Sequence, residues 1–591
     1  MPKKPNSLLA RFLIWKSRHI PQRQFILILS VVVGFITGLV AVTLKNVTHL
    51  IQDLVSSGYF TEYYNPYYFV FPIIGILITL LIKRLINKPV GEGVPAVLHS
   101  ISKRNGILKP HRMFGSIATS IFTVGFGGSV GLEGPSVSTG SAIGSNLGRL
   151  MHINFKSRIV LMSCASAAAI ASIFNAPIAA IIFTIEIFSL DLTFGSLIPL
   201  LLASVSGAVT SMFIQGNDYL FHFKYISPFD IQDLPFYILL GVLCAFVSLY
   251  FNKIYLFFDS FFSKMKNQTT RVLFGGGLLG LIIFLIPPLY GEGYETINHL
   301  LNGDLNSVIE NSFLYEYATS EYLILVLLIG LVVFKVFATT FTIGAGGVGG
   351  VFAPSLFVGA SFGYVFSKFI NETNIVELST ANYTLVGMAG LMAGVLHAPL
   401  TAIFMIAEIT GGYELFVPLM IVSAISFLVT RKFMPHSIYT LQLAKRGELI
   451  THNKDQAILT LLKIDSVIET DFSSVNAEMS LGDLVKVVAK SKRNLYPVIN
   501  EQKILVGILT LDNFRNIMFD QSLYESMRVS DLMTNPPGFI NKTENMSSVM
   551  QKFQSTGAWN LPVVEKGIYI GFVSKSKLFS VYRRKLIEFS E

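Results

Sequence analysis

Two glycine-rich segments contain the residues with the most distinctive chemistry in this sequence. GGSVGLEGPS (127–136) holds a single carboxylate, Glu133, and TIGAGGVGGVFAPS (342–355) holds none. Each has a proline near the expected first turn of a helix, so each predicts a helix that breaks and restarts. The unpaired N–H groups and partial positive charge of a helix start attract anions, and glycine lets the backbone approach a ligand closely. Together they predict a site for a small anion, with Glu133 as a competitor of that anion.

The sequence around these segments predicts membrane helices. Of 591 residues, 52% are hydrophobic and only 14% are charged, and the mean hydropathy is +0.58. Apolar runs near or above the roughly 20 residues that cross a bilayer recur from about residue 25 to residue 435. The first 24 residues are basic without an acid, and no cleavage site follows the first apolar span. We therefore expect a multi-pass protein of the cell (inner) membrane, with cytoplasmic N- and C-termini.

The composition argues against several other classes of protein. The net charge of +9 fits membrane topology and contact with anionic lipid. Because no basic cluster is interleaved with aromatic residues, we expect no nucleic-acid partner. Cys164 and Cys244 lie in apolar segments without metal-ligand spacing, which indicates packing residues, no disulfide framework and no metal site. The sequence has no nucleophile–base pair, metal cluster or phosphate-binding loop, so we do not expect an enzyme.

The apolar region contains an internal repeat. FNAPIAAIIFTIEIF (174–188) and LHAPLTAIFMIAEIT (396–410) share Ala-Pro, an apolar run and a glutamate, at an offset of 222 residues. GLEGPS aligns with GVFAPS at nearly the same offset. Matching Gly/Pro-interrupted segments in two halves point to a transporter-type site between the halves. We interpret the two glutamates, Glu186 and Glu408, as structural residues that bind backbone groups at helix ends.

These segments resemble signatures of the CLC family of chloride channels and chloride/proton exchangers. The resemblance covers essentially the whole apolar region, and it rests on GEGVP (91–95), GLEGP (131–135), GVFAP (350–354) and Tyr439 in SIYTLQL. It implies an all-α membrane domain of two inverted repeats of tilted and broken helices. It also implies a homodimer with one anion path per subunit. Chloride or a similar small anion and protons would be the transported partners, without a cofactor.

The resemblance implies a role for each matching residue. The central anion would be held by the backbone N–H groups of Val351 and Phe352 and by the phenol of Tyr439. The outer anion would be held by the N–H groups of Leu132, Glu133 and Gly134. Glu133 matches the family's gating glutamate, which closes the path when ionised and carries a proton when protonated.

Three positions depart from the family pattern. Glu92 stands where a serine usually contacts the central anion, and a carboxylate about 4 Å from an anion repels it by roughly 4 kcal/mol at an effective dielectric constant of about 20. Glu92 thus turns away, or is protonated and donates a hydrogen bond, or weakens the central site; we favour weakened or backbone-only coordination. Leu132 replaces a common Lys or Arg and should lower anion capture at low salt. Ile187 stands where exchangers often carry an inner proton-transferring glutamate.

After about residue 441 the sequence resembles a soluble tandem pair of cystathionine-β-synthase (CBS) domains, which are α/β. We expect the following order of segments: 1–24 cytoplasmic, 25–440 membrane domain, 441–463 linker, 464–520 first CBS domain and 521–591 second CBS domain. Such pairs often bind adenine nucleotides through a hydroxyl and an aspartate three residues later. These positions are Thr510 with Asn513 and Ser574 with Lys577. Because the carboxylates are missing, nucleotide binding and a structural or dimerising role are both open.

The sequence therefore predicts a CLC-type anion transporter with a regulatory CBS tail, and chloride/proton exchange gated by Glu133 is the preferred mechanism. A voltage- or pH-gated anion channel without proton coupling is the main alternative. Ile187 favours that alternative, although an inner water path or Glu186 could still deliver protons. A CBS-regulated divalent-cation transporter would need more acidic residues facing a pore than this region provides. A receptor or scaffold would leave the broken-helix repeat unexplained.

Overall fold

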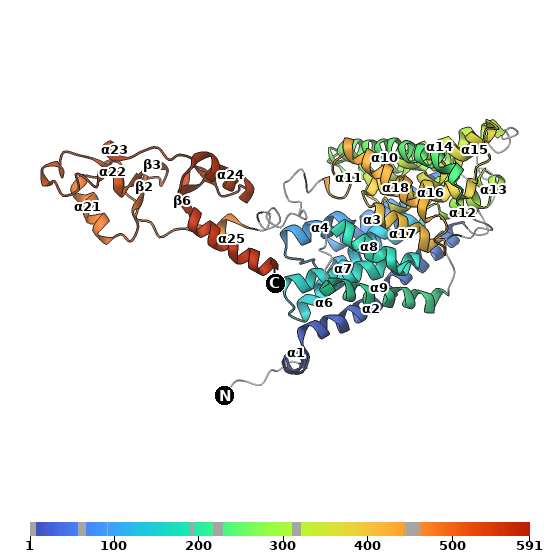
Figure 1. Ribbon diagram of the computed structural model, residues 1–591, viewed down its shortest axis with the longest axis horizontal. Helices are drawn as coiled ribbons and strands as arrows, with labels where there is room; N and C mark the ends of the chain where they lie inside the picture. Colours follow the sequence, from blue (N-terminus) through green and yellow to red (C-terminus); the bar gives the residue numbers. More distant parts are fainter. Residues whose placement is uncertain are drawn as a thin grey trace. The chain divides into compact units, whose positions relative to one another are not determined.

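The computed structural model of the chain describes residues 8–56, 67–91, 93–188, 194–216, 221, 228–309, 321–441, 444, 459 and 462–590. The chain divides into two compact units, Met1–Lys445 and Arg446–Glu591 (Figure 1). The first unit is helical, and the second contains both helices and strands.

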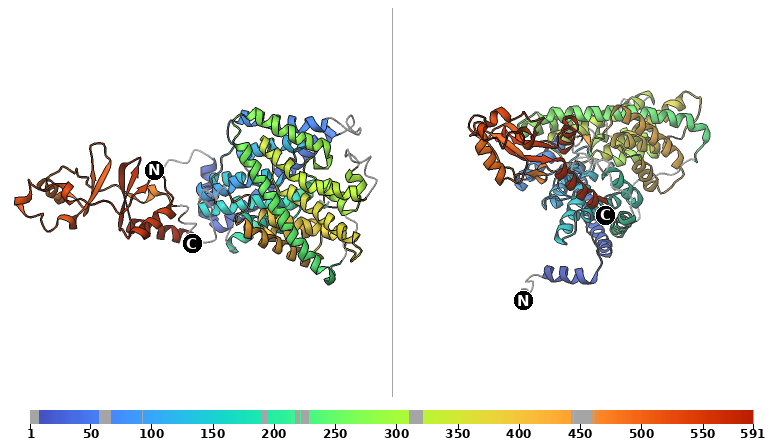
Figure 2. Two further views of the ribbon diagram at one scale, coloured as in Figure 1. Left: turned by 90° about the horizontal axis from the view of Figure 1, so that it is seen from above. Right: turned by 60° about the vertical axis from the view of Figure 1, so that its left-hand side comes forward.

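Helices of the first unit run at varied tilts to one another rather than as a parallel bundle (Figure 2). The helices of its first half are α1 (Leu8–His19), α2 (Gln22–Ser56), α3 (Tyr67–Ile86), α4 (Gly93–Lys103), α5 (Arg112–Gly125), α6 (Glu133–Leu150), α7 (Phe155–Phe174), α8 (Pro177–Phe188) and α9 (Phe194–Gln215). Those of its second half are η1 (Ile231–Asp233), α10 (Leu234–Ser263), α11 (Gln268–Leu285), η2 (Pro287–Leu289), α12 (Tyr294–Leu301), α13 (Leu305–Ile309), α14 (Glu321–Ala345), α15 (Phe352–Glu372), α16 (Thr380–Leu396), α17 (Pro399–Ile409) and α18 (Phe416–Phe433). Within the described ranges, eight segments are long and apolar enough to cross a membrane.

The repeat in the sequence is also a repeat of helices, because α6–α9 correspond in order to α15–α18. Helix α7 starts where the Asn154 side chain accepts a hydrogen bond from a backbone N–H, and α16 starts in the same way at Ser379. Both helices end on a residue in the left-handed conformation, Asn175 (φ 56°) and His397 (φ 58°), 222 positions apart. The two halves therefore share local backbone signals as well as composition.

Small residues let the paired helices of each half approach closely. A Cβ atom on Gly144 of α6 would lie 2.5 Å from the Leu161 carbonyl oxygen of α7. In the second half, a Cβ atom on Gly363 of α15 would lie 2.0 Å from the Tyr383 carbonyl oxygen of α16. No larger side chain fits at either contact without moving a helix, so these glycines fix the spacing of both pairs.

The two halves cap each other's helices. Glu186, near the end of α8, accepts hydrogen bonds from the Leu400 N–H (3.0 Å) and the Thr401 N–H (2.8 Å) at the start of α17. Glu408, near the end of α17, accepts from the Ile178 N–H (3.0 Å) and the Ala179 N–H (2.7 Å) at the start of α8. Each helix end thus meets the other's start, so α8 and α17 lie antiparallel, as inverted repeats require. The structural role predicted for both glutamates is confirmed.

The described part of the second unit contains six short strands. Its elements are η4 (Ile464–Ser466), β1 (Ile468–Glu469), α21 (Leu481–Lys490), β2 (Leu495–Ile499), β3 (Leu505–Thr510), α22 (Leu511–Phe514), η5 (Gln521–Leu523), α23 (Val529–Leu532), β4 (Ile540–Asn541), α24 (Met546–Thr556), β5 (Asn560–Glu565), β6 (Ile568–Ser574) and α25 (Lys575–Ser590). One sheet has the order β1-β6-β5-β4 and the other pairs β2 with β3.

The two repeats of the second unit are interlocked. Strand β1 lies at the start of the first repeat but pairs antiparallel with β6 of the second. In return, Thr534 and Ile508 exchange two backbone hydrogen bonds (2.8 and 2.9 Å), which attaches the start of the second repeat to β3. Each repeat thus completes the sheet of the other.

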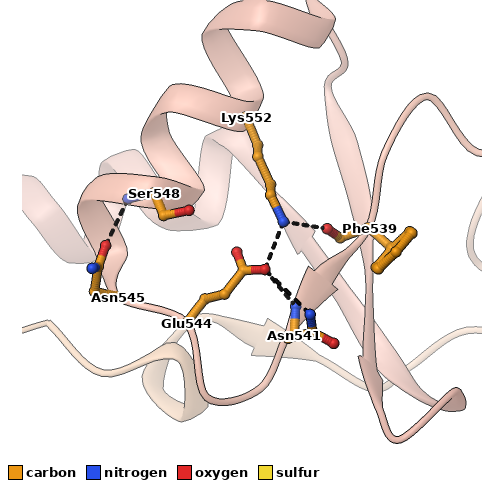
Figure 3. A network of polar contacts seen from close by, with 6 residues as sticks. All are labelled: Phe539, Asn541, Glu544, Asn545, Ser548 and Lys552. Carbon is orange, nitrogen blue, oxygen red and sulfur yellow. Dashed lines mark hydrogen bonds and ion pairs between the residues drawn. The ribbon is translucent and has the colours of Figure 1, made fainter.

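Figure 3 shows the polar contacts that tie α24 to its own repeat. The Lys552 ammonium donates to Glu544 Oε1 (2.6 Å) and to the Phe539 carbonyl (2.9 Å) beside β4. Asn545 caps the helix by accepting from the Ser548 N–H at 2.8 Å. Because the Glu544 and Lys552 side chains are only partly exposed, solvent screens this ion pair less than a fully exposed one.

Candidate functional site

The two broken helices meet. Gly131, just before α6, and Gly350, just before α15, form an antiparallel bridge with N–H···O distances of 2.9 Å and 2.7 Å. A Cβ atom on Gly350 would lie 3.0 Å from the Gly134 amide nitrogen. The starts of α6 and α15, one from each half of the unit, therefore lie side by side with their N–H groups close together.

Both breaks are built by the same turn. After α5 the Gly128 N–H bonds to the Thr123 carbonyl (2.8 Å), and after α14 the Gly347 N–H bonds to the Thr342 carbonyl (2.9 Å). The preceding glycines, Gly127 (φ 90°) and Gly346 (φ 108°), occupy backbone conformations that other residues rarely adopt. Glycine is therefore needed at both positions to end one helix and aim the next.

Glu133 lies between the two helix starts. Its side chain is 2% exposed, and Oε1 accepts a hydrogen bond from the Tyr294 hydroxyl at 2.6 Å. The carboxyl group lies close to the backbone N–H groups of Glu133 and Ala353. Among the described residues, Oε2 has no partner with regular hydrogen-bond geometry. The carboxylate is thus held at one oxygen, in the positive field of two helix starts.

Aromatic rings pack around Tyr294 and the start of α15. The Tyr294 ring contacts Phe174 (6.4 Å between centroids) and Phe221 (5.9 Å), both edge to face. Phe352, the first residue of α15, packs on Phe174 (5.1 Å) and Phe183 (6.4 Å). These rings limit access of water to the carboxylate and hold the Tyr294 hydroxyl in place.

A second buried carboxylate, Glu292, contacts the start of α6. Its Oε1 accepts the Leu132 N–H at 3.0 Å, and its side chain comes from the segment between η2 and α12. Glu292 is 8% exposed, and its charge interacts with those of Glu133, Lys45 and Lys335. Sequence reasoning missed Glu292, Tyr294 and Lys335. A second Gly-Glu-Gly at 291–293, matching that at 91–93, was the available signal.

Four other membrane-domain residues were singled out in the sequence. Tyr439 is buried, and the charge of Glu133 acts on its phenol. The Leu132 side chain is buried in an apolar cluster with Leu44, Val124 and Val130. Ile187 is buried in α8. Glu92 lies outside the described residues.

A pocket of about 350 Å³ lies beside the second carboxylate. Glu292 and Tyr294 line it together with residues of α2, including His49 and Asp53, and with Glu295. Glu292, which contacts the start of α6, and Tyr294, which contacts Glu133, therefore both line this pocket.

In the tail, both hydroxyls proposed for nucleotide binding have internal partners. The Thr510 side chain and N–H both donate to Asn513 Oδ1, which closes the first turn of α22. The Ser574 hydroxyl donates to Glu469 Oε1 at 2.5 Å, and the other oxygen of that carboxylate accepts from Arg493 at 2.8 Å. Lys577 is exposed, and its N–H donates to the Ser574 hydroxyl.

A helical unit of two halves, whose broken helices start at one buried carboxylate, defines a multi-pass membrane protein of the repeat-built transporter class. The chain belongs to the voltage-gated chloride channel family, whose sequence profile matches residues 74–431. Residues 464–520 and 529–584 match the CBS domain. The predicted family and fold class are thus confirmed.

Relatives and solved structures agree with this assignment. The chain is 30% identical to a ClcB-like protein of Ralstonia nicotianae over 60% of this chain and 80% of the relative. It is 26% identical to the H(+)/Cl(−) exchange transporter ClcA of Vibrio cholerae, over 67% of this chain and 84% of the relative. The fold resembles that of a slow cyanobacterial Cl−/H+ antiporter, with a TM-score of 0.61, 20% identity and coverage of 72% of this chain and 98% of the other. It also resembles a eukaryotic CLC transporter, with a TM-score of 0.60, 19% identity and coverage of 97% and 99%.

Proposed function

We propose that the protein exchanges chloride, or a similarly small anion, for protons across the membrane, with Glu133 as the gate. One observation carries the proposal: the buried Glu133 carboxylate lies between the starts of α6 and α15, where the field of both helices attracts negative charge. A carboxylate in that position competes with any anion that uses the same N–H groups.

The gate works through the charge of this one side chain. Ionised Glu133 is held by the helix starts and by the Tyr294 hydroxyl, and it excludes the anion. Protonation removes the charge, so the carboxyl group loses most of its attraction to the helix starts and can move out. An anion then takes its place, while the proton travels with the side chain. The movement of Glu133 couples the two ions.

The anion path uses backbone groups more than side-chain cations. In the proposal the N–H groups of Val351 and Phe352 and the phenol of Tyr439 hold the central anion, and those of Leu132, Glu133 and Gly134 hold the outer one. Partial charges of this kind bind an ion without a full counter-charge, so the ion can also leave quickly. The burial of Tyr439 near Glu133 supports a shared path.

Exchange is preferred over an uncoupled channel because several relatives and structural neighbours are named as exchangers or antiporters. The observation that favours a channel is Ile187, which removes the usual inner glutamate. Glu186 is a poor substitute, since α17 already donates two N–H groups and the Thr401 hydroxyl to it. In an exchanger, protons would therefore reach Glu133 from the cytoplasm by another route.

The proposal extends to assembly and location. The protein would be a homodimer in the cell membrane, with one path in each subunit, cytoplasmic termini and the CBS pair as a regulatory tail. In this proposal the protein is a transporter, and protons and a small anion are the ions that it carries.

The deciding experiment places the purified full-length protein in liposomes that carry a chloride gradient and no other electrical shunt. An exchanger drives protons uphill, and Glu133→Gln abolishes that movement. Glu295→Gln, a change of the same kind at a side chain that is 92% exposed, should leave it intact. Robust chloride flux without uphill protons would indicate the channel, and no chloride flux at all would refute anion transport.

A further inference from the structure

The start of α6 is contacted by two carboxylates. Glu133 is the first residue of the helix, whereas Glu292 comes from a segment 160 positions away in sequence and accepts the Leu132 N–H at 3.0 Å. In the proposed function that N–H belongs to the outer anion site. One donor of the outer site is therefore already bound by a carboxylate of the protein itself.

The segment that carries Glu292 is fixed against the break before α6. The Gly291 N–H bonds to the Gly127 carbonyl (3.3 Å), and a Cβ atom on Gly127 would lie 2.1 Å from the Tyr290 ring. Lys335 of α14, which is fully buried, donates to the Gly291 carbonyl at 2.9 Å. Glu292 is thus positioned by contacts on both sides, so its bond to Leu132 is a built feature of the site.

We infer that Glu292 is a second acidic gate, which occupies the outer anion position until it is protonated or displaced. This inference rests on the proposed function and deepens it. Ionised Glu292 would meet an incoming anion as a like charge in a buried setting, where such repulsion is weakly screened. Protonated Glu292 would lose that repulsion and bind the Leu132 N–H less strongly. The pocket of about 350 Å³ beside Glu292 provides its access to solvent protons.

Other charges and titratable groups around Glu292 belong to several elements. Helix α6 contributes Glu133, and α14 contributes Lys335, which carries the opposite charge. The others are Lys45, His49 and Asp53 of α2, Tyr68 of α3, Tyr290 and Tyr294, and Glu295 and His299 of α12. Among these, the lysines stabilise the ionised form of Glu292, and Glu133 opposes it.

The test measures chloride binding to purified full-length protein by calorimetry, from acidic to neutral pH, with Glu133 already replaced. In the Glu133→Gln background, Glu292 is the carboxylate that still contacts the start of α6. We expect the double variant Glu133→Gln/Glu292→Gln to bind chloride about tenfold more tightly than Glu133→Gln at neutral pH. The difference should close at acidic pH, where Glu292 is protonated. The glutamine oxygen can still accept the Leu132 N–H, so the change isolates the charge.

The matched control is Glu133→Gln/Glu295→Gln, because Glu295 lines the same pocket but is exposed. It should bind chloride like Glu133→Gln. Equal affinities with and without Glu292 at every pH would overturn the inference. If the double variant does not fold, the Glu133→Gln protein alone decides, because chloride affinity that does not change with pH would overturn it equally. Absence of chloride flux in the wild-type liposomes would instead refute the proposed function.

Discussion

The Tyr294 hydroxyl donates a 2.6 Å hydrogen bond to Oε1 of Glu133, a contact between residues 161 positions apart. This bond holds the carboxylate between the two helix starts by one oxygen, while the second oxygen has no regular hydrogen bond among the described residues. A phenol at this distance stabilises the ionised carboxylate, because hydrogen bonds to charged groups are the stronger ones.

Tyr294→Phe should loosen the gate. Loss of a hydrogen bond to a charged group costs about 1.5 to 3 kcal/mol, so the side chain should leave its position more often. Chloride flux in liposomes should rise, and fewer protons should move for each chloride. Tyr290→Phe is the control, since its hydroxyl donates to the Gly125 carbonyl (3.3 Å) and does not contact Glu133. Unchanged coupling in Tyr294→Phe would contradict the role given to this bond.

Lowering the pH should speed chloride transport by the wild-type protein. Protonation of Glu133 and Glu292 removes two negative charges from the anion path. Acid should therefore activate chloride transport. The dependence should weaken in Glu133→Gln and disappear in Glu133→Gln/Glu292→Gln, as measured by chloride efflux at a series of pH values. A double variant that keeps the wild-type pH profile would place the titrating group elsewhere.

Glu186→Ala should destabilise the membrane unit. The change leaves the N–H groups of Leu400 and Thr401 without their acceptor at the start of α17, which should lower the free energy of unfolding by about 2 to 4 kcal/mol. Thermal unfolding in detergent measures the effect. Thr401→Val removes only the hydroxyl bond to Glu186 and should have a smaller effect. Equal melting temperatures of Glu186→Ala and the wild type would show that Glu186 does not stabilise α17 by capping it.

Adenine nucleotides should bind the tail weakly. The Glu469 carboxylate accepts a hydrogen bond from the Ser574 hydroxyl at 2.5 Å. A phosphate bound to that hydroxyl would be repelled by the carboxylate. Glu469→Gln should therefore tighten ATP binding to the full-length protein about tenfold, as measured by calorimetry. Glu501→Gln, at an exposed position of the same repeat, should change nothing. The same ATP affinity in Glu469→Gln and wild type would show that Glu469 does not compete with phosphate.

Local signals made part of this structure predictable. Glycine-rich breaks followed by proline marked the starts of α6 and α15. The Pro-to-Glu spacing marked the repeat, in which Glu186 caps α17 and Glu408 caps α8. These features depend on backbone geometry and on residues near in sequence. The convergence of the two breaks followed from the repeat itself, because equivalent segments of two related halves meet near the axis between them.

The second carboxylate could not be placed in the same way. Glu292, Tyr294 and Lys335 reach the site from segments far from Glu133 in sequence, and no periodicity relates them to it. Their contacts depend on how η2 and α14 pack on the break before α6. In the tail, the contact of Glu469 with Ser574 requires the exchange of strands between repeats.

The reciprocal caps on α8 and α17 have a consequence for biosynthesis. The N–H groups of Ile178 and Ala179 receive their acceptor from Glu408, which the ribosome adds some 230 residues later. At ordinary translation speeds this delay is on the order of ten seconds or more. During that time these two N–H groups of the newly inserted first half have no Glu408 carboxylate to bind within the membrane. Neither half should then mature alone, and two half-length chains made separately should become stable only when they are produced together.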